Sequence, residues 1–261
     1  MFDENCFITL TYDNDHLPLV NGVPTLVKKD FQDFMKRFRK HHRGFKEISY
    51  INASGDSVTC YPIRYYHCGE YGETFGRPHY HASIFNFDFY DKEQIGVSNG
   101  FPLYTSKLLQ ELWPFGHVTV APFSFQTAAY VARYMMKKAK GAFEMQSAHT
   151  LIDPVTGEVL GERQGEYCTM SRSPGIGRLW YDKFKDDVYP SDQVVINGFP
   201  SKPPRFYDNM LMLEDPCAFD DLQYERYIKS LKFVDNNTPE RLAVREACKK
   251  ADLNKLVRRL D

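Results

Sequence analysis

The sequence contains no C-x-x-C pair, although six cysteines are scattered singly along its 261 residues. This spacing excludes a zinc finger and gives no sign of a disulfide framework. Isolated cysteines are typical of proteins kept in a reducing compartment, so we expect a cytoplasmic location. The chain also has no signal peptide and no apolar run long enough to span a membrane, and we therefore expect no membrane partner.

The sequence also lacks an excess of positive charge and a nucleotide-binding P-loop. A formal net charge of −1 argues against binding nucleic acid through bulk charge, so any such contact must come from local basic patches. No G-x-x-x-x-G-K-[ST] run occurs, which argues against an attached P-loop helicase. Aromatic residues are abundant, with 20 Phe and 17 Tyr, and they suit dense cores as well as stacking on unpaired bases.

The run from Arg77 to Phe85 is predicted to be a strand that carries two histidines on one face. Strand side chains alternate, so His79 and His81 point to the same side while Tyr80 points to the other. Two imidazoles on one rigid strand make half of a metal site. The alternative is that both histidines are ordinary polar residues of a half-buried strand.

A second strand-like run, Ile63 to Cys68, leads into Gly69 and Glu70 just before the histidine strand. The pair predicts a hairpin that brings Glu70 beside the two histidines. Two imidazoles and one carboxylate leave coordination positions open for a substrate oxygen. The sequence leaves Glu73 and His67 as alternatives for the third ligand.

The run from Ser124 to Gly141 predicts a helix of about four turns, with a capping residue at the start and a glycine at the end. Tyr130 and Tyr134 are four residues apart and share one face, which Lys137 and Lys138 continue. An amphipathic helix with packed tyrosines and solvated lysines would show the same pattern. The histidine pair upstream is what favours a catalytic interpretation.

Together these motifs resemble the HUH superfamily of single-strand DNA endonucleases. The name refers to two histidines flanking a hydrophobic residue, here His79, Tyr80 and His81, and the second motif is a helix with one or two tyrosines and a following lysine. The chain is similar, more narrowly, to replication initiation proteins of gokushovirus-type microviruses over about its first two-thirds. The matching runs are Phe7 to Asp13, Cys68 to Gly72, the histidine strand, Tyr130 to Lys138 and Ser173 to Gly177.

The resemblance implies a rolling-circle initiator that nicks single-stranded origin DNA. A tyrosine, Tyr130 or Tyr134, would attack the phosphodiester, giving a 5′-phosphotyrosine and a free 3′-hydroxyl, and the strand would later be rejoined to release a circle. The family implies Mg²⁺ or Mn²⁺, and imidazole ligands tilt affinity towards Mn²⁺. Lys137 is the first choice for a cation near the scissile phosphate and Lys138 the second. Expected partners are origin DNA and the host helicase and polymerase, in the host bacterial cytoplasm.

Two other functions fit the same residues. One is a metal-dependent nucleic-acid hydrolase in which water attacks and the tyrosines only shape the pocket. The other is a non-catalytic module that binds single-stranded nucleic acid through stacking aromatics. Capture of a covalent adduct separates the first from the initiator, and metal-dependent nicking separates the second.

The order of elements predicts an α+β fold, a mostly antiparallel central sheet with helices on one face. The histidine strand is expected in the middle of the sheet, and the strand that bears Thr9 and Thr11 is also expected to be central. We expect an endonuclease domain over residues 1–200 and a helical extension over residues 201–261.

A further helix is expected from Val27 to Arg43, with apolar residues at helical spacing and a basic opposite face. The sequence leaves two interpretations of that face open, a solvated surface and a patch for the DNA backbone. Lys36, Arg39, Lys40 and Arg43 are the residues on which a test would act.

Overall fold

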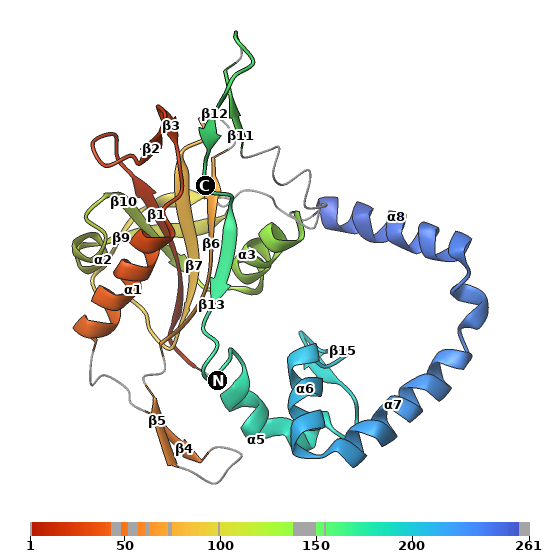
Figure 1. Ribbon diagram of the computed structural model, residues 1–261. Coiled ribbons are helices and arrows are strands. Elements are labelled where there is room, and N and C mark those ends of the chain that lie inside the picture. The colour runs from red at the N-terminus through yellow and green to blue at the C-terminus, as the bar shows by residue number, and fades with distance from the viewer. Residues whose placement is uncertain are drawn as a thin grey trace. The chain divides into compact units, whose positions relative to one another are not determined.

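We describe a computed structural model of the chain over residues 2–42, 48–51, 57–60, 63–72, 75–98, 100–137, 150–153 and 155–255 (Figure 1). The chain divides into two compact units. The first contains nearly all of the described residues up to Ile176, and the second contains those from Gly177 onwards. The division into domains at residue 200 stays a prediction.

The first unit is built on a seven-stranded sheet, and every neighbouring pair of its strands is antiparallel. The sheet order is β13-β6-β7-β1-β10-β9-β8, so β1 is the central strand and the histidine strand β7 lies next to it. This confirms the α+β class with its antiparallel sheet. The strands are β1 (Asn5–Tyr12), β6 (Arg64–Tyr71), β7 (Pro78–Phe85), β8 (Lys92–Ser98), β9 (Phe101–Ser106), β10 (Gly116–Pro122) and β13 (Tyr167–Met170).

Helices cover both faces of this sheet, so the expectation of helices on one face is wrong (Figure 1). Helices α1 (Lys28–His41) and α2 (Lys107–Leu112) pack on the face that carries Ile8, Leu10 and Tyr80. Helix α3 (Phe125–Lys137) packs on the opposite face, where Val131 joins Phe7, Cys68 and Ala121. The α3 backbone lies against β6, β7 and β13.

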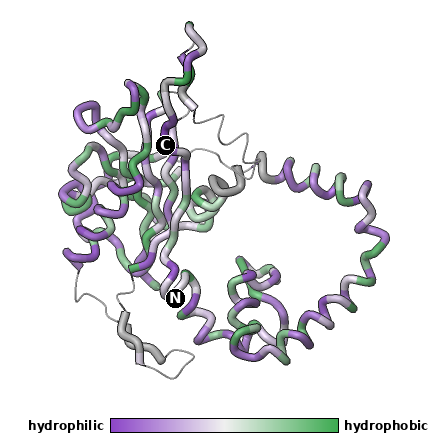
Figure 2. The backbone as a smooth tube through the Cα atoms, in the orientation of Figure 1, coloured by the Kyte–Doolittle hydropathy of each residue, from purple (hydrophilic) through white to green (hydrophobic). Residues whose placement is uncertain are grey.

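The α1 helix forms where the spacing of apolar residues predicts it. Phe31, Phe34, Met35 and Phe38 are fully buried against the sheet, and the hydrophilic residues between them can be followed in Figure 2. The helix ends at His41, and the glycine expected to end it, Gly44, lies outside the described residues.

Two tyrosines of the sheet attach the start of α1. The Val27 N–H donates to the Tyr80 hydroxyl (3.0 Å), which donates to the Val27 carbonyl (2.8 Å). The Tyr12 hydroxyl, 2.8 Å from that of Tyr80, donates to the Asp30 carboxylate at 2.7 Å. Burial raises the pKa of Tyr80 to about 12, so its hydroxyl keeps its proton.

The substitution Tyr80→Phe is expected to lower the free energy of unfolding by about 1–3 kcal/mol, because it leaves buried backbone groups of Val27 without their partner. Urea denaturation measures the loss. The control is Tyr90→Phe, since the Tyr90 side chain is 83% exposed and is expected to change stability by less than about 0.5 kcal/mol. Equal stability of the two variants would contradict this account of the α1 start.

The two short helix starts that the sequence predicts are present. The Ser106 side chain caps α2 by accepting from the Leu109 N–H at 3.0 Å. Ser124 precedes α3, and its hydroxyl accepts from the Thr127 N–H at 3.2 Å. The end of the tyrosine helix expected at Gly141 lies outside the described residues.

The hairpin of β8 and β9 was missed by the sequence prediction. Strand β8 lies at the edge of the sheet and most of its residues are exposed, so it carries no alternation of apolar and polar side chains. A register shift between Gln94 and Gly96 interrupts the pairing further. Edge strands with bulges give a weak period-two pattern, which explains the omission.

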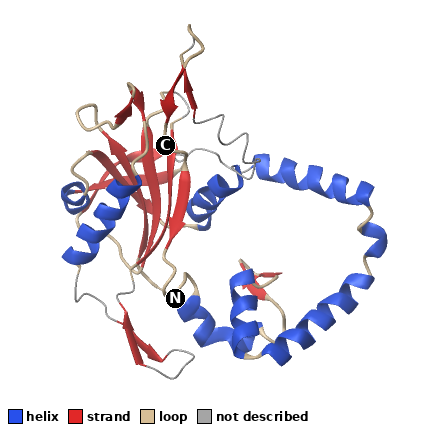
Figure 3. Ribbon diagram, in the orientation of Figure 1, coloured by secondary structure: helices blue, strands red, loops and turns tan. Residues whose placement is uncertain are grey.

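Four further pairs of short strands make small hairpins (Figure 3). The predicted turns at Asn21 and at Asp153 each join one of these pairs. The first-unit strands are β2 (Leu19–Val20), β3 (Val23–Pro24), β4 (Ile48–Ile51), β5 (Ser57–Cys60), β11 (Thr150–Ile152) and β12 (Val159–Glu162).

The second unit is mainly helical. The segment from Lys202 to Phe206 was predicted to be a linker, but α6 already begins at Arg205. Arg226 on α7 forms ion pairs with Asp192 and Asp208. Among the described residues, no helix is both long and apolar enough to cross a membrane. The elements are α5 (Arg178–Val188), β14 (Val194–Ile196), β15 (Phe199–Ser201), α6 (Arg205–Glu214), α7 (Pro216–Leu231), a 3₁₀ turn (Val234–Asn236) and α8 (Pro239–Lys255).

Candidate metal centre

Strand register brings polar residues into two neighbouring rows across one face of the sheet. Directly opposite residues of antiparallel strands point to the same face, so each row is a set of neighbouring side chains. This surface, called here the histidine face, is the one on which α3 packs. One row contains His117, Thr11, His79 and Glu70, and the next contains Thr119, Thr9, His81 and Cys68.

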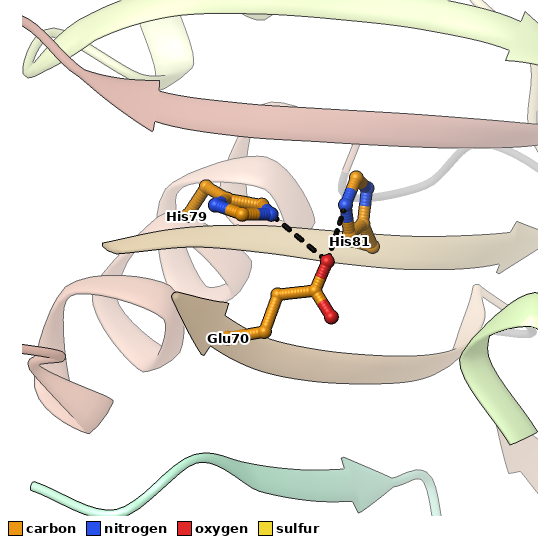
Figure 4. A group of neighbouring side chains, drawn as sticks. All are labelled: Glu70, His79 and His81. Atoms are coloured by element: carbon orange, nitrogen blue, oxygen red, sulfur yellow. Dashed lines mark hydrogen bonds and ion pairs between the residues drawn. The ribbon is translucent and has the colours of Figure 1, made fainter. Parts of the chain in front are cut away.

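The side chains of Glu70, His79 and His81 converge on one point (Figure 4). Oε1 of Glu70 lies 2.9 Å from Nε2 of His79 and 2.9 Å from Nε2 of His81. The two imidazole planes are nearly perpendicular, at 84°. One potential ligand atom from each residue lies within 4.8 Å of the other two. The structure thus places Glu70 beside the two histidines, at the position the hairpin predicts.

The three residues are almost fully enclosed, yet Glu70 is ionised. Glu70 and His81 are each 1% exposed and His79 is 9% exposed. Burial alone raises the pKa of Glu70, but its interactions with His79 and His81 outweigh burial and hold the pKa of this carboxyl well below its usual range. A deprotonated carboxylate is the form that binds a metal ion.

The residues fit a divalent cation. Two ligand atoms that are each about 2.1 Å from an ion, at right angles to one another, lie about 3.0 Å apart, close to the 2.9 Å found here. The same spacing is that of a hydrogen bond, so the cluster is also stable as a metal-free triad. Two imidazoles and a carboxylate form the mixed N,O set that transition metals bind while leaving positions open.

Each imidazole is held from its other side as well. Nδ1 of His79 lies 3.1 Å from the Arg77 carbonyl oxygen, and Nδ1 of His81 lies 2.9 Å from the Thr9 hydroxyl. The Phe7 ring stacks on His81, with centroids 5.5 Å apart and planes 22° apart. These contacts fix the orientation of both rings.

Of the two alternative third ligands, His67 lies on the other face of the sheet. Its ring stacks on Phe31 with centroids 3.5 Å apart, and its Nδ1 lies 2.7 Å from the Thr169 hydroxyl. Burial lowers the pKa of His67 to about 3, so it is a neutral core residue. Glu73 lies outside the described residues.

Helix α3 carries the predicted tyrosines, and it packs against the strands that bear Glu70 and the histidines. Tyr130, Tyr134 and Lys137 belong to this helix by their backbone, but their side chains lie outside the described part of the chain, and so does all of Lys138. The structure therefore puts the helix on the histidine face and leaves the catalytic roles of these four residues as predictions.

Metal binding tests the cluster independently of catalysis. The wild-type protein is expected to bind one Mn²⁺ in calorimetry, and the double variant His79→Ala, His81→Ala is expected to lose that binding because two of three ligands are gone. Glu70→Gln keeps the size of the side chain and is expected to weaken affinity at least about tenfold. The control is His117→Ala, an exposed histidine of the same face. Unchanged Mn²⁺ binding in the double variant would show that the ion binds elsewhere.

An antiparallel α+β sheet with two histidines and a carboxylate on one face is the architecture of HUH-like proteins. Residues 5–139 match the model of a family of replication-associated proteins of the ORF2 type. The chain belongs to this family.

Three phage proteins are among its relatives. The chain is 30% identical to replication-associated protein VP4 of Bdellovibrio phage phiMH2K, over 88% of this chain and 64% of that protein. It is 29% identical to replication-associated protein ORF2 of Spiroplasma virus 4, over 86% and 62%, and 28% identical to replication-associated protein ORF4 of Chlamydia phage 1, over 89% and 52%. The chain thus spans less than two-thirds of the length of each. No solved structure matches it.

Proposed function

We propose that this protein initiates rolling-circle replication by nicking single-stranded origin DNA and joining itself to the new 5′ end. The observation that carries the proposal is the convergence of Glu70, His79 and His81 on the sheet face that the tyrosine helix covers. Membership of a replication-associated family supports the same activity.

Glu70, His79 and His81 are the residues that would hold the divalent cation, Mg²⁺ or Mn²⁺. When bound, the cation supplies Lewis-acid polarisation of the scissile phosphate and stabilises negative charge in the transition state. The rigid hairpin of β6 and β7 fixes the ligands before substrate arrives, which reduces the cost of reorganisation during the reaction.

A tyrosine hydroxyl, of Tyr130 or Tyr134, is the proposed nucleophile. Its oxygen forms a bond to phosphorus while the bond from phosphorus to the 3′ oxygen breaks, and the 3′ oxygen takes up a proton. A phenol has an ordinary pKa near ~10, so the attack needs help to remove the proton. The phosphodiester becomes a phosphotyrosine diester, and the conserved ester energy allows rejoining without ATP.

Lys137 is the proposed cation near the scissile phosphate, with Lys138 as the second choice. An ammonium group there offsets charge on the phosphate oxygens and orients the strand. The free 3′-hydroxyl is a primer for the host polymerase, and strand separation would fall to a host helicase. The relatives are phage proteins, so the proposed setting is the cytoplasm of an infected bacterium.

The test is incubation of the protein with end-labelled single-stranded origin DNA and Mn²⁺, followed by a denaturing gel. The proposal predicts a shortened strand and a labelled protein–DNA adduct that survives denaturation, both absent when a chelator is added. Cleavage without an adduct would indicate a hydrolase instead. Binding without cleavage would indicate a non-catalytic module.

The basic face of α1 is expected to contribute little to DNA binding. Lys36, Arg39 and Lys40 are exposed, but α1 lies on the sheet face opposite Glu70 and the histidines. Replacing these three by Ala is expected to leave the salt dependence of single-strand binding unchanged. Lys137→Ala is expected to lower the slope of log K against log salt by about 0.7, the share of one phosphate contact on a single strand.

Fluorescence anisotropy over a salt series measures both variants. A clearly flatter slope in the α1 triple variant would assign its basic face to the DNA backbone. Arg43, the fourth residue of the predicted patch, lies outside the described residues and is left unchanged in this variant.

A further inference from the structure

Thr9 lies directly opposite His81 in the pairing of β1 with β7. Its hydroxyl oxygen is 2.9 Å from Nδ1 of His81, the ring nitrogen that faces away from Glu70. The strand around Thr9 is otherwise apolar on both sides, since Phe7, Ile8 and Leu10 are fully buried. A valine would have the same shape and an equal preference for a strand, so the hydroxyl needs an explanation beyond packing.

We propose that Thr9 is a positioning residue for the metal centre, whose hydroxyl accepts the Nδ1–H of His81 and so keeps Nε2 as the ligand atom directed at the cation. The inference rests on the proposed function, because it assumes that His81 binds a metal ion. It assigns to β1 a role in the site to which the three ligand residues on β6 and β7 do not themselves point.

The chemistry of imidazole explains why such a partner matters. A neutral imidazole carries its proton on one nitrogen, and the other nitrogen can ligate a metal ion. A hydrogen-bond acceptor at Nδ1 therefore selects the form whose Nε2 lone pair is available. A threonine hydroxyl both donates and accepts, so the contact with Nδ1 persists whether or not an ion is present.

The two histidines are supported in different ways, which makes Thr9 open to a clean test. His79 has a backbone partner at Nδ1, the Arg77 carbonyl, which no side-chain substitution removes. His81 has a side-chain partner, and the stacked Phe7 ring restrains the plane of the imidazole without choosing between its nitrogens. Removal of the Thr9 hydroxyl should therefore affect His81 alone.

The experiment measures Mn²⁺ affinity by calorimetry in Thr9→Val, Thr9→Ser and Thr11→Val. Thr9→Val keeps the shape of the side chain and is expected to bind Mn²⁺ about 10–100-fold more weakly. Thr9→Ser keeps the hydroxyl and is expected to stay within about threefold of wild type. Thr11 is the matched control, because it is the next threonine of β1 on the same face and stands opposite His79.

A second readout uses the wild-type protein and needs no variant to fold. ¹⁵N NMR of the His81 ring in the presence of Mg²⁺ is expected to show the proton on Nδ1. A proton on Nε2 of His81 in the Mg²⁺-loaded protein would overturn the inference, and so would Mn²⁺ affinity of Thr9→Val equal to that of wild type.

These outcomes are distinguishable from failure of the proposed function. If wild-type protein binds no Mn²⁺, the metal centre itself is wrong. If wild-type protein binds Mn²⁺ and Thr9→Val binds it equally well, the centre stands and only the role of Thr9 falls. If Thr9→Ser loses as much affinity as Thr9→Val, the methyl group rather than the hydroxyl is responsible, which also contradicts the inference.

Discussion

Replacing both Tyr130 and Tyr134 by Phe is expected to abolish the covalent protein–DNA adduct and to lower the rate of strand cleavage at least about 10³-fold. The proposed reaction needs a phenol oxygen as the nucleophile, and the double substitution removes both candidates while keeping the rings that pack. The measurement is adduct formation on labelled single-stranded DNA with Mn²⁺.

The single variants test how the two tyrosines share the reaction. A rolling-circle initiator remains joined to the 5′ end after the first cut, so a second cut by the same molecule needs a second free hydroxyl. Tyr130 and Tyr134 are one helical turn apart, with Cβ atoms expected about 5–6 Å from each other. Each single Phe variant is expected to retain first cleavage and to fail in the second cut and joining on a two-site substrate.

The control is Tyr90→Phe, which removes an exposed hydroxyl from the same unit of the protein. It is expected to cleave and join as wild type does. If one of the two helix variants keeps normal cleavage and joining while the other has neither, the alternating scheme is wrong and one tyrosine is structural.

The second large effect is expected from the metal ligands. His79→Ala or His81→Ala is expected to lower cleavage at least about 10³-fold, because several kcal/mol of transition-state stabilisation is lost with the cation. The side chains lie on one face of a sheet whose main core is on the other face, so the fold is expected to persist.

Circular dichroism and thermal unfolding check that the histidine variants are folded. The His117→Ala control changes an exposed histidine in the same row as His79 and is expected to leave cleavage unchanged. Cleavage by folded His79→Ala at the wild-type rate would exclude the cluster from the reaction.

The parts of the fold that the sequence predicted well are those with strong local periodicity. The buried residues of α1 recur at helical spacing, and the alternation in β7 separates the histidines from Tyr80 and Ile84. The hairpin of β6 and β7 is local, so its register could be expected to bring Glu70 to His79. These local patterns were enough to predict the three residues of the cluster.

The parts that were missed depend on contacts between distant segments. Neither the side of the sheet on which α3 packs nor the pairing of Thr9 with His81 can be read from periodicity, because each needs the strand order. Thr9 was recognised only as part of a central strand. A polar residue between buried apolar neighbours was the signal that could have indicated its contact.

The measurement that tests the central claim most directly is mass spectrometry of the adduct. Protein reacted with single-stranded origin DNA and Mn²⁺ is digested with nuclease and protease, and the peptide that carries the residual nucleotide is sequenced. The account predicts a 5′-phosphate linked to Tyr130 or Tyr134. A nucleotide on any other residue, or cut DNA with no modified peptide, would contradict it.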